Sequence, residues 1–585
     1  MALPRLHSPA SPAAGTAPHF SDTEASVAEA VEVYHRTYTT LLRSSGEMRL
    51  RVLEMSHKAM NASLHPLAAS PELDLGAFLY AVRRLPEPLM GAQRVVMGQS
   101  FEVFARNGFT ALETWHEVSA PGRRRRWYAD GDGTLAVLIA SASDVDDLVP
   151  TLVAFEIEWN KLHVRLRAAG WDGPAAKTPR ATDCATALGG REDDWAQLLE
   201  VWGPRFSERM AAVAERKMSL RLRMLGGTQV GYARVTRRWW EQVAAVQRAE
   251  GLVDRPIYFV SSNSHSLVNL ASGIAPERAD ELVEFVRNFG PADLRAELER
   301  FHQGQTEGDW NNFLYYAARL WFRSVADDSP AQRERREVER RLGIFHVGSR
   351  TALDVAAQVI ALSSLDPARF DPRLGAVDAA ALRASRALIV NIDYPLGLAA
   401  YNILREIAET AGELRGVYIL GKAATLNADV GDVMLSNVVH DEHSGSTYWL
   451  DNVFNVGDIA PWLRFGSGLD NQRAVTVKGT FLQNHGYLDF YYREAFTVVE
   501  MEAGPYCAAV YELSESGRYP AGEPVNFSKL PIDLGVIHYA SDTPFTQART
   551  LGARGLSYYG MDSTYAASVA ILRRVLKLEG ALREA

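Results

Sequence analysis

The chain of 585 residues has two cysteines, Cys184 and Cys507, too few for a disulfide framework or a cysteine zinc site. It lacks any apolar run long enough to span a membrane, and its first residues lack the hydrophobic core of a signal peptide. It has no excess of basic residues, because 62 Lys and Arg stand against 71 Asp and Glu, a net charge of −9. That balance argues against a protein that coats nucleic acids without sequence specificity. We therefore expect a cytoplasmic protein with no membrane and no nucleic-acid partner.

The chain is longer than a single domain with one hydrophobic core usually is, so more than one domain is expected. Residues 1–20 are rich in Pro, Ala and Ser, and we predict a disordered tail. Residues 21–342 are predicted to form a large, mainly helical α+β region of unknown role. An alternative is that this region consists of two subdomains with a break near 170–190. Residues 343–380 read as a connecting segment, and 381–585 as an α/β domain.

The α/β prediction for the C-terminal third rests on short apolar runs that alternate with helical segments. These buried-strand patterns lie at 387–392, 416–420, 433–439, 475–482 and 534–540. They predict a central mixed sheet that is flanked by helices.

Acidic residues stand where two of these elements end. The segment Glu500–Glu502 lies between a short β-rich stretch and a predicted helix, and Ser541-Asp542 follows the strand at 534–540. In open α/β sheets, groups at the carboxyl ends of strands line the ligand crevice. Two carboxylates on two such ends are therefore predicted to converge on one ligand.

The sequence Glu-Met-Glu-Ala-Gly, followed by a strand that ends in Ser-Asp, resembles the purine nucleoside phosphorylase and nucleosidase superfamily. The resemblance covers about 387–576. It implies that Met501 and Glu502 hold the ribose and that Asp542 protonates a purine ring nitrogen. It also implies that Arg554 supports Asp542. We expect no cofactor, no metal and a homo-oligomer that binds a small nucleoside or nucleotide.

Further substrate contacts are expected at seven positions, and these are Glu500, Phe490, Phe481, Ser541, Lys422, Gly421 and Asp393. Phe490 or Phe481 is predicted to stack on the base. Ordinary structural interpretations stay open beside the functional ones. Phe490 is equally a core residue, Glu502 a first-turn helix acid, and Asp542 a strand-end or helix cap.

Two departures from the superfamily pattern bear on the attacking group. Gly397 and Ile419 stand where a phosphorylase usually has arginines, and Lys422 is the cation of the adjacent loop. A lone lysine holds a phosphate dianion less specifically than an arginine fork. The sequence therefore favours hydrolysis, with Asp393 as either a partner for the water or a turn cap. A phosphorylase whose phosphate ligands come from elsewhere, with Arg350 the first to test, is the alternative.

These observations predict an enzyme that cleaves the N-glycosidic bond of a purine nucleoside or nucleotide. The two-part layout is similar to that of AMP nucleosidases. A hypothesis from another class is a non-catalytic nucleotide-sensing or scaffold protein on the same fold.

Two polar segments outside the C-terminal third have competing interpretations. Arg123–Arg126 read as a solvated basic edge before Trp127, with phosphate contact as the alternative. Ser261–His265 follow a buried strand and read either as a helix cap or as an anion site. A helix is expected over 351–363.

Overall fold

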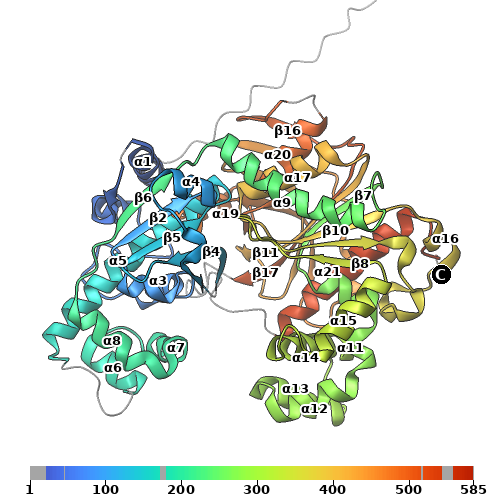
Figure 1. Ribbon diagram of the computed structural model, residues 1–585, viewed down its shortest axis with the longest axis horizontal. Coiled ribbons are helices and arrows are strands. Elements are labelled where there is room, and N and C mark those ends of the chain that lie inside the picture. The colour runs from blue at the N-terminus through green and yellow to red at the C-terminus, as the bar shows by residue number, and fades with distance from the viewer. Residues whose placement is uncertain are drawn as a thin grey trace, which may run out of the picture.

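The computed structural model describes residues 22–44, 46–120, 122–171, 179–514, 518–542 and 558–583. The predicted tail at 1–20 lies outside the described residues, as does Arg554. Within that range the protein is a mixed α/β structure with two sheets, and the α/β prediction for the C-terminal third is confirmed in this coarse form. Figure 1 shows the smaller sheet in blue and cyan beside the larger one.

The first sheet has six strands in the order β1-β6-β2-β5-β4-β3. β2 is parallel to β5 and β6, whereas the outer pairs are antiparallel. Its strands are β1 (Met48–Arg49), β2 (Arg94–Gly98), β3 (His116–Ala120), β4 (Arg123–Ala129), β5 (Thr134–Leu138) and β6 (Arg221–Leu225).

Helices pack around this sheet. The longest, α5 (Ala142–Ala168), begins just after β5, where the Asp144 carboxylate accepts the backbone N–H of Ala140 and Ser141. The others are α1 (Asp22–Ser44), α2 (Glu54–Ala59), α3 (Leu75–Val82), α4 (Phe101–Arg106), α6 (Ala181–Leu188), α7 (Glu192–Trp202), α8 (Phe206–Glu215) and α9 (Gln229–Ala249).

The second sheet has eleven strands. These are β7 (Ile257–Ser262), β8 (Ile344–Val347), β9 (Ala357–Ala361), β10 (Leu388–Asp393), β11 (Leu414–Thr425), β12 (Val433–Asp441), β13 (Ser446–Trp449), β14 (Gly468–Thr476), β15 (Val498–Glu500), β16 (Pro524–Asn526) and β17 (Asp533–Asp542). β12, β14, β15, β11 and β17 pair in a closed ring. Because the ring is closed, the ends of β11, β15 and β17 are held next to one another.

Helices cover this sheet as well. They are α10 (Ser266–Ser272), α11 (Ile274–Glu277), α12 (Ala279–Phe289), α13 (Ala292–His302), α14 (Trp310–Ser324), α15 (Pro330–Arg341), α16 (Ala379–Ala384), α17 (Leu398–Thr410), α18 (Val456–Ile459), α19 (His485–Arg493), α20 (Ala503–Ser514) and α21 (Tyr558–Leu578).

The larger sheet extends into the segment that was assigned to the N-terminal region. β7 lies between β10 and β11 and runs parallel to both. The segment 351–363 holds β9 instead of the expected helix, because its apolar residues pair with β10 and are fully buried. Asn263 accepts the backbone N–H of His265 and Ser266, so the polar loop after β7 caps α10.

One local difference from the predicted strands matters for the site. Lys422 lies within β11, because this strand continues to Thr425, whereas a loop was expected to begin at Gly421.

One hydrophobic cluster contains residues of both sheets, among them Val96, Leu138, Val390 and Val417. The two parts of the chain therefore share a core.

Candidate functional site

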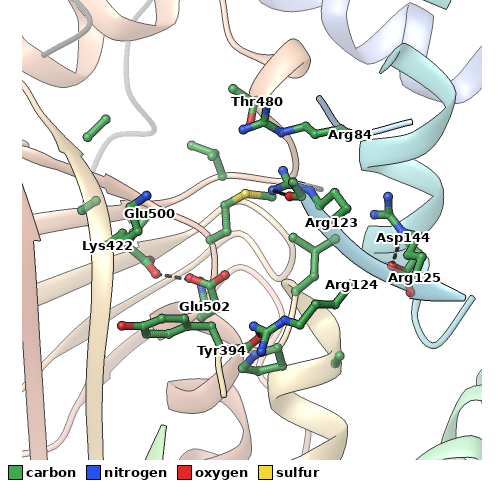
Figure 2. A pocket seen from close by; sticks show the side chains of 18 of the residues that line it. Arg84, Arg123, Arg124, Arg125, Asp144, Tyr394, Lys422, Thr480, Glu500 and Glu502 are labelled. Atoms are coloured by element: carbon green, nitrogen blue, oxygen red, sulfur yellow. Dashed lines mark hydrogen bonds and ion pairs between the residues drawn. The ribbon is translucent and has the colours of Figure 1, made fainter. Parts of the chain in front are cut away.

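A cavity of about 440 Å³ lies between the two parts of the chain and is lined by residues of both. Figure 2 shows arginines of the N-terminal part opposite acidic residues of the C-terminal part. The charged lining residues are Arg84, Arg123, Arg124, Arg125, Asp144, Asp354, Lys422, Glu500, Glu502 and Asp542.

The C-terminal wall is built on three neighbouring strands. Residue 424 of β11 pairs with Val499 of β15 on one side and with Asp542 of β17 on the other. Glu502 follows β15 by two residues, and Asp542 ends β17. The register of these strands therefore brings Glu502, Asp542 and Lys422 to one cavity, together with Met501 and Ser541.

Glu500 has a structural position, although a substrate contact was expected there. Its carboxylate accepts the backbone N–H of Glu502 at 2.6 Å and of Ala503 at 2.7 Å. It also accepts the hydroxyl of Thr476, and only 3% of the residue is exposed. These contacts satisfy the open N–H groups at the start of α20.

Glu502 is half-buried and turns towards the cavity. Burial, and then the neighbouring carboxylate of Glu500, raise the pKa of Glu502 to about 8, whereas Arg123 and Arg124 act in the opposite direction. A carboxyl group with this environment can either accept or donate a hydrogen bond at neutral pH.

Asp542 and Lys422 lie close enough to influence each other. Asp542 is buried and accepts the hydroxyl of Ser541 at 2.7 Å. Burial lowers the pKa of Lys422, Asp542 raises it, and the like charges of Arg84 and Arg123 lower it further. The carboxyl group of Asp542 therefore lies where it can contact a ligand in the cavity.

The arginine run 123–126 is not a solvated edge, so that interpretation is wrong. It forms the first half of β4, in which Arg125 is 5% exposed. Arg125 donates to Asp144 and Asp147 at 2.7 Å each, and Arg123 donates to both oxygens of Asp147. The alternation of a strand places Arg123 and Arg125 on one face, a signal that the sequence contained.

Arg84 is a cavity residue that sequence reasoning missed. It lies just after α3 and is 5% exposed, with its guanidinium carbon 3.4 Å from the centroid of the Tyr80 ring. Burial lowers the pKa of Arg84 to about 10, and Arg123 adds to that effect. No motif marks this arginine, because its role depends on the packing of α3 against the other part.

Asp393 does not line the cavity. Its carboxylate accepts Arg124 at 2.7 Å, and the same arginine donates to the Tyr394 carbonyl at 2.7 Å. Asp393 thus joins the two parts beside the cavity, where Tyr394, Pro395 and Leu396 form the wall. Asp393 was expected to contact the substrate, but its carboxylate instead forms this ion pair with Arg124.

The two aromatic candidates also lie off the cavity wall. Phe481 is 2% exposed and packs edge-on against Tyr80, with ring centroids 5.2 Å apart. Phe490 packs against Tyr491, and Leu488 of the same helix lines the cavity instead. Gly421 is buried opposite His538. Arg350 is exposed and does not line the cavity.

Among the residues that the structure describes, no cluster of His, Cys, Asp and Glu is arranged to hold a metal ion. None of the described helices is long and apolar enough to cross a membrane.

A family model matches residues 50–577, and its description is a family of unknown function, DUF6909. No curated protein matches the chain.

Several solved structures are similar to this chain, and they are nucleosidases and phosphorylases. The 5′-methylthioadenosine/S-adenosylhomocysteine nucleosidase of Neisseria meningitidis has 12% identity and a TM-score of 0.26, over 41% of this chain and 94% of that one. The same enzyme of Campylobacter jejuni has 13% identity and a TM-score of 0.26, over 41% and 91%. Uridine phosphorylase of Schistosoma mansoni has 11% identity and a TM-score of 0.27, over 56% and 89%. Similarity at this level does not assign a function to the chain.

Proposed function

This chain belongs to DUF6909, a family of unknown function, and we propose that it hydrolyses the N-glycosidic bond of a purine nucleoside or nucleotide. The observation that carries the proposal is the presence of Glu502 and Asp542 in one cavity, at the ends of two strands that both flank β11. The resemblance of the segments 500–504 and 541–542 to nucleosidases supports the same reaction.

In this reaction the bond between the sugar carbon and the base nitrogen breaks, and the base leaves with the electron pair. Asp542 gives a proton to the leaving purine, which makes departure easier. Water adds to the sugar carbon, and its proton restores Asp542. Glu502 accepts hydrogen bonds from the sugar hydroxyls, and its ionised form favours the oxocarbenium-like transition state.

Water is the proposed attacking group because Gly397 and Ile419 stand where a phosphorylase usually has arginines. Of the arginines that line the cavity, Arg125 is paired with Asp144 and Arg124 with Asp393. A phosphate nucleophile is held best by a bidentate contact with an arginine guanidinium group. Arginines do line the cavity, however, so phosphorolysis with ligands from the N-terminal part is the alternative.

The test is release of free base from a panel of purine nucleosides and nucleotides, with and without inorganic phosphate. Base release without phosphate is expected. The variant Asp542→Asn should lose on the order of 10²-fold or more of that rate, because the general acid is missing. The matched control is Asp489→Asn, an exposed residue of α19 that does not line the cavity.

Other outcomes contradict the proposal in distinguishable ways. Strict dependence on phosphate, with a sugar 1-phosphate as the product, indicates a phosphorylase. Saturable binding of a nucleotide without release of any base indicates a sensing or scaffold protein.

A further inference from the structure

Cations from both parts of the chain line the cavity. Arg84 and Arg123 come from the N-terminal part, and Lys422 comes from β11 of the larger sheet. Each lines the cavity, and Figure 2 shows Arg84 and Arg123 directed into it. Arg84 is 5% exposed, so its charge lies in a largely desolvated wall.

These cations influence one another at close range. Arg123 and Arg84 both lower the pKa of Lys422, and Arg123 lowers that of Arg84, in each case after burial as the largest cause. Placing like charges together in a buried wall is unfavourable in the absence of an anion.

The carboxylates nearby balance part of this charge. Asp147 is shared between Arg123 and Arg125. Glu502 has a raised pKa because of burial and of Glu500, so much of it is neutral near pH 7. Asp542 acts on both Arg84 and Lys422. The ammonium group of Lys422 makes no hydrogen bond or ion pair with any residue that the structure describes.

We infer that Arg84, Arg123 and Lys422 bind the phosphate of a nucleoside 5′-monophosphate, an assignment that rests on the proposed function for the rest of the ligand. Guanidinium and ammonium groups together are the usual donors to a phosphate dianion. A single carboxylate on the substrate would leave part of this charge uncompensated. The volume of about 440 Å³ falls in the range of pockets that enclose ligands of nucleotide size.

The assignment gives the N-terminal part a role in specificity. The strand ends of the larger sheet contact the sugar and the base, whereas Arg84 and Arg123 recognise the phosphate. A nucleoside without its phosphate is then a weaker ligand, because it lacks the acceptor oxygens for these three groups.

The test is calorimetric titration of AMP, adenosine and orthophosphate, each into the full chain. AMP is expected to bind at least about tenfold more tightly than adenosine, since a charged hydrogen bond contributes on that order. Lys422→Met should remove about tenfold of the affinity for AMP and change that for adenosine much less, and Lys422→Arg should restore most of the affinity for AMP. Arg84→Met is the second variant, and circular dichroism checks its folding. Arg350→Met, an exposed arginine outside the cavity, is the matched control.

Equal affinity for AMP and adenosine overturns the inference, as does an AMP affinity that Lys422→Met leaves unchanged. Adenosine that binds tightly only when orthophosphate is present also overturns it, since the cations then hold the free ion. Base release measured on the same samples separates this inference from the proposed function. Tight AMP binding without release of base refutes the proposed function and supports the inference. Equal binding of AMP and adenosine, with release of base from both, supports the proposed function and refutes the inference.

Discussion

Glu500 and Glu502 carry the same functional group two positions apart, yet their environments differ. The Glu500 carboxylate is held by two backbone N–H groups and a hydroxyl, and it faces the interior. Glu502 lines the cavity, and its pKa is raised by burial and by the charge of Glu500. One residue thus stabilises the wall, and the other remains available to a ligand.

The raised pKa of Glu502 gives a pH dependence with a definite sign. If the ionised carboxylate is needed, kcat/KM for base release should rise with pH and level off above about 8. Glu502→Gln should be slower and should lose this rise. The measurement is a pH profile of initial rates for both proteins.

Stability should change in the opposite direction over the same range. Glu502 holds its proton in the folded protein up to about pH 8, whereas an unfolded glutamate ionises near about 4.3. The free energy of unfolding should therefore fall as pH rises between these values, by at most about 1.4 kcal/mol per pH unit for this proton. A Glu502→Gln variant that shows the same slope in urea titrations would contradict this assignment.

At the scale of single elements, α20 depends on a residue that precedes it. Helix N-termini leave backbone N–H groups without partners inside the helix. Glu500, the last residue of β15, accepts two of them, and Gly504 donates its own N–H to Thr476 at 2.7 Å. The end of the strand and the start of the helix are therefore stabilised together.

Replacing this acceptor should weaken the whole junction. Glu500→Ala leaves two buried N–H groups unpaired, and we expect a loss of about 2 kcal/mol or more in the free energy of unfolding. Chemical denaturation followed by circular dichroism measures it. Glu494→Ala, an exposed residue between α19 and β15, should change stability by less than about 0.5 kcal/mol. Equal effects of the two variants would show that the cap has no special role.

At the scale of the whole molecule, the N-terminal and C-terminal parts meet next to the cavity through polar contacts of Ser143. The Ser143 hydroxyl of α5 accepts the N–H of Leu398, the first residue of α17, at 2.9 Å. It also lies 3.3 Å from Nε2 of His443, whose other ring nitrogen is 2.9 Å from Asp441. Gly397 has a φ of +51°, and a Cβ there would lie 2.2 Å from the Ser143 oxygen. An arginine at 397 is therefore excluded by the neighbouring part of the chain.

Adding one methyl group at this contact should separate the two parts. Gly397→Ala combines an unfavourable φ with a steric clash, and we expect a loss of about 2 kcal/mol or more together with weaker ligand binding. Thermal unfolding and calorimetry measure the two effects. In the double variant with Ser143→Gly the clash is relieved, so ligand affinity should partly return. A Gly397→Ala protein with unchanged stability would show that the junction adjusts freely.

Several features of the fold and the cavity followed from local sequence. Runs such as Leu388–Ile392 are apolar over the length of a strand, and such runs are buried in parallel sheets wherever the chain places them. The positions of Glu502 and Asp542 at strand ends depend on the same local patterns, and both line the cavity. Their catalytic roles remain predictions.

The tertiary structure decided what faces these carboxylates. Arg124 donates to the carbonyl of Tyr394 across 270 positions of the chain. Arg84 lines the cavity just after α3, whose Tyr80 packs against Phe481 of the C-terminal part. The sequence suggested that the site lacked arginines, since motifs record neighbours along the chain. Periodicity determines which residues are buried within an element, because it depends on backbone geometry alone. Which elements meet depends on packing between distant segments, and for that reason only the folded chain showed that the N-terminal part supplies the cationic wall of the cavity.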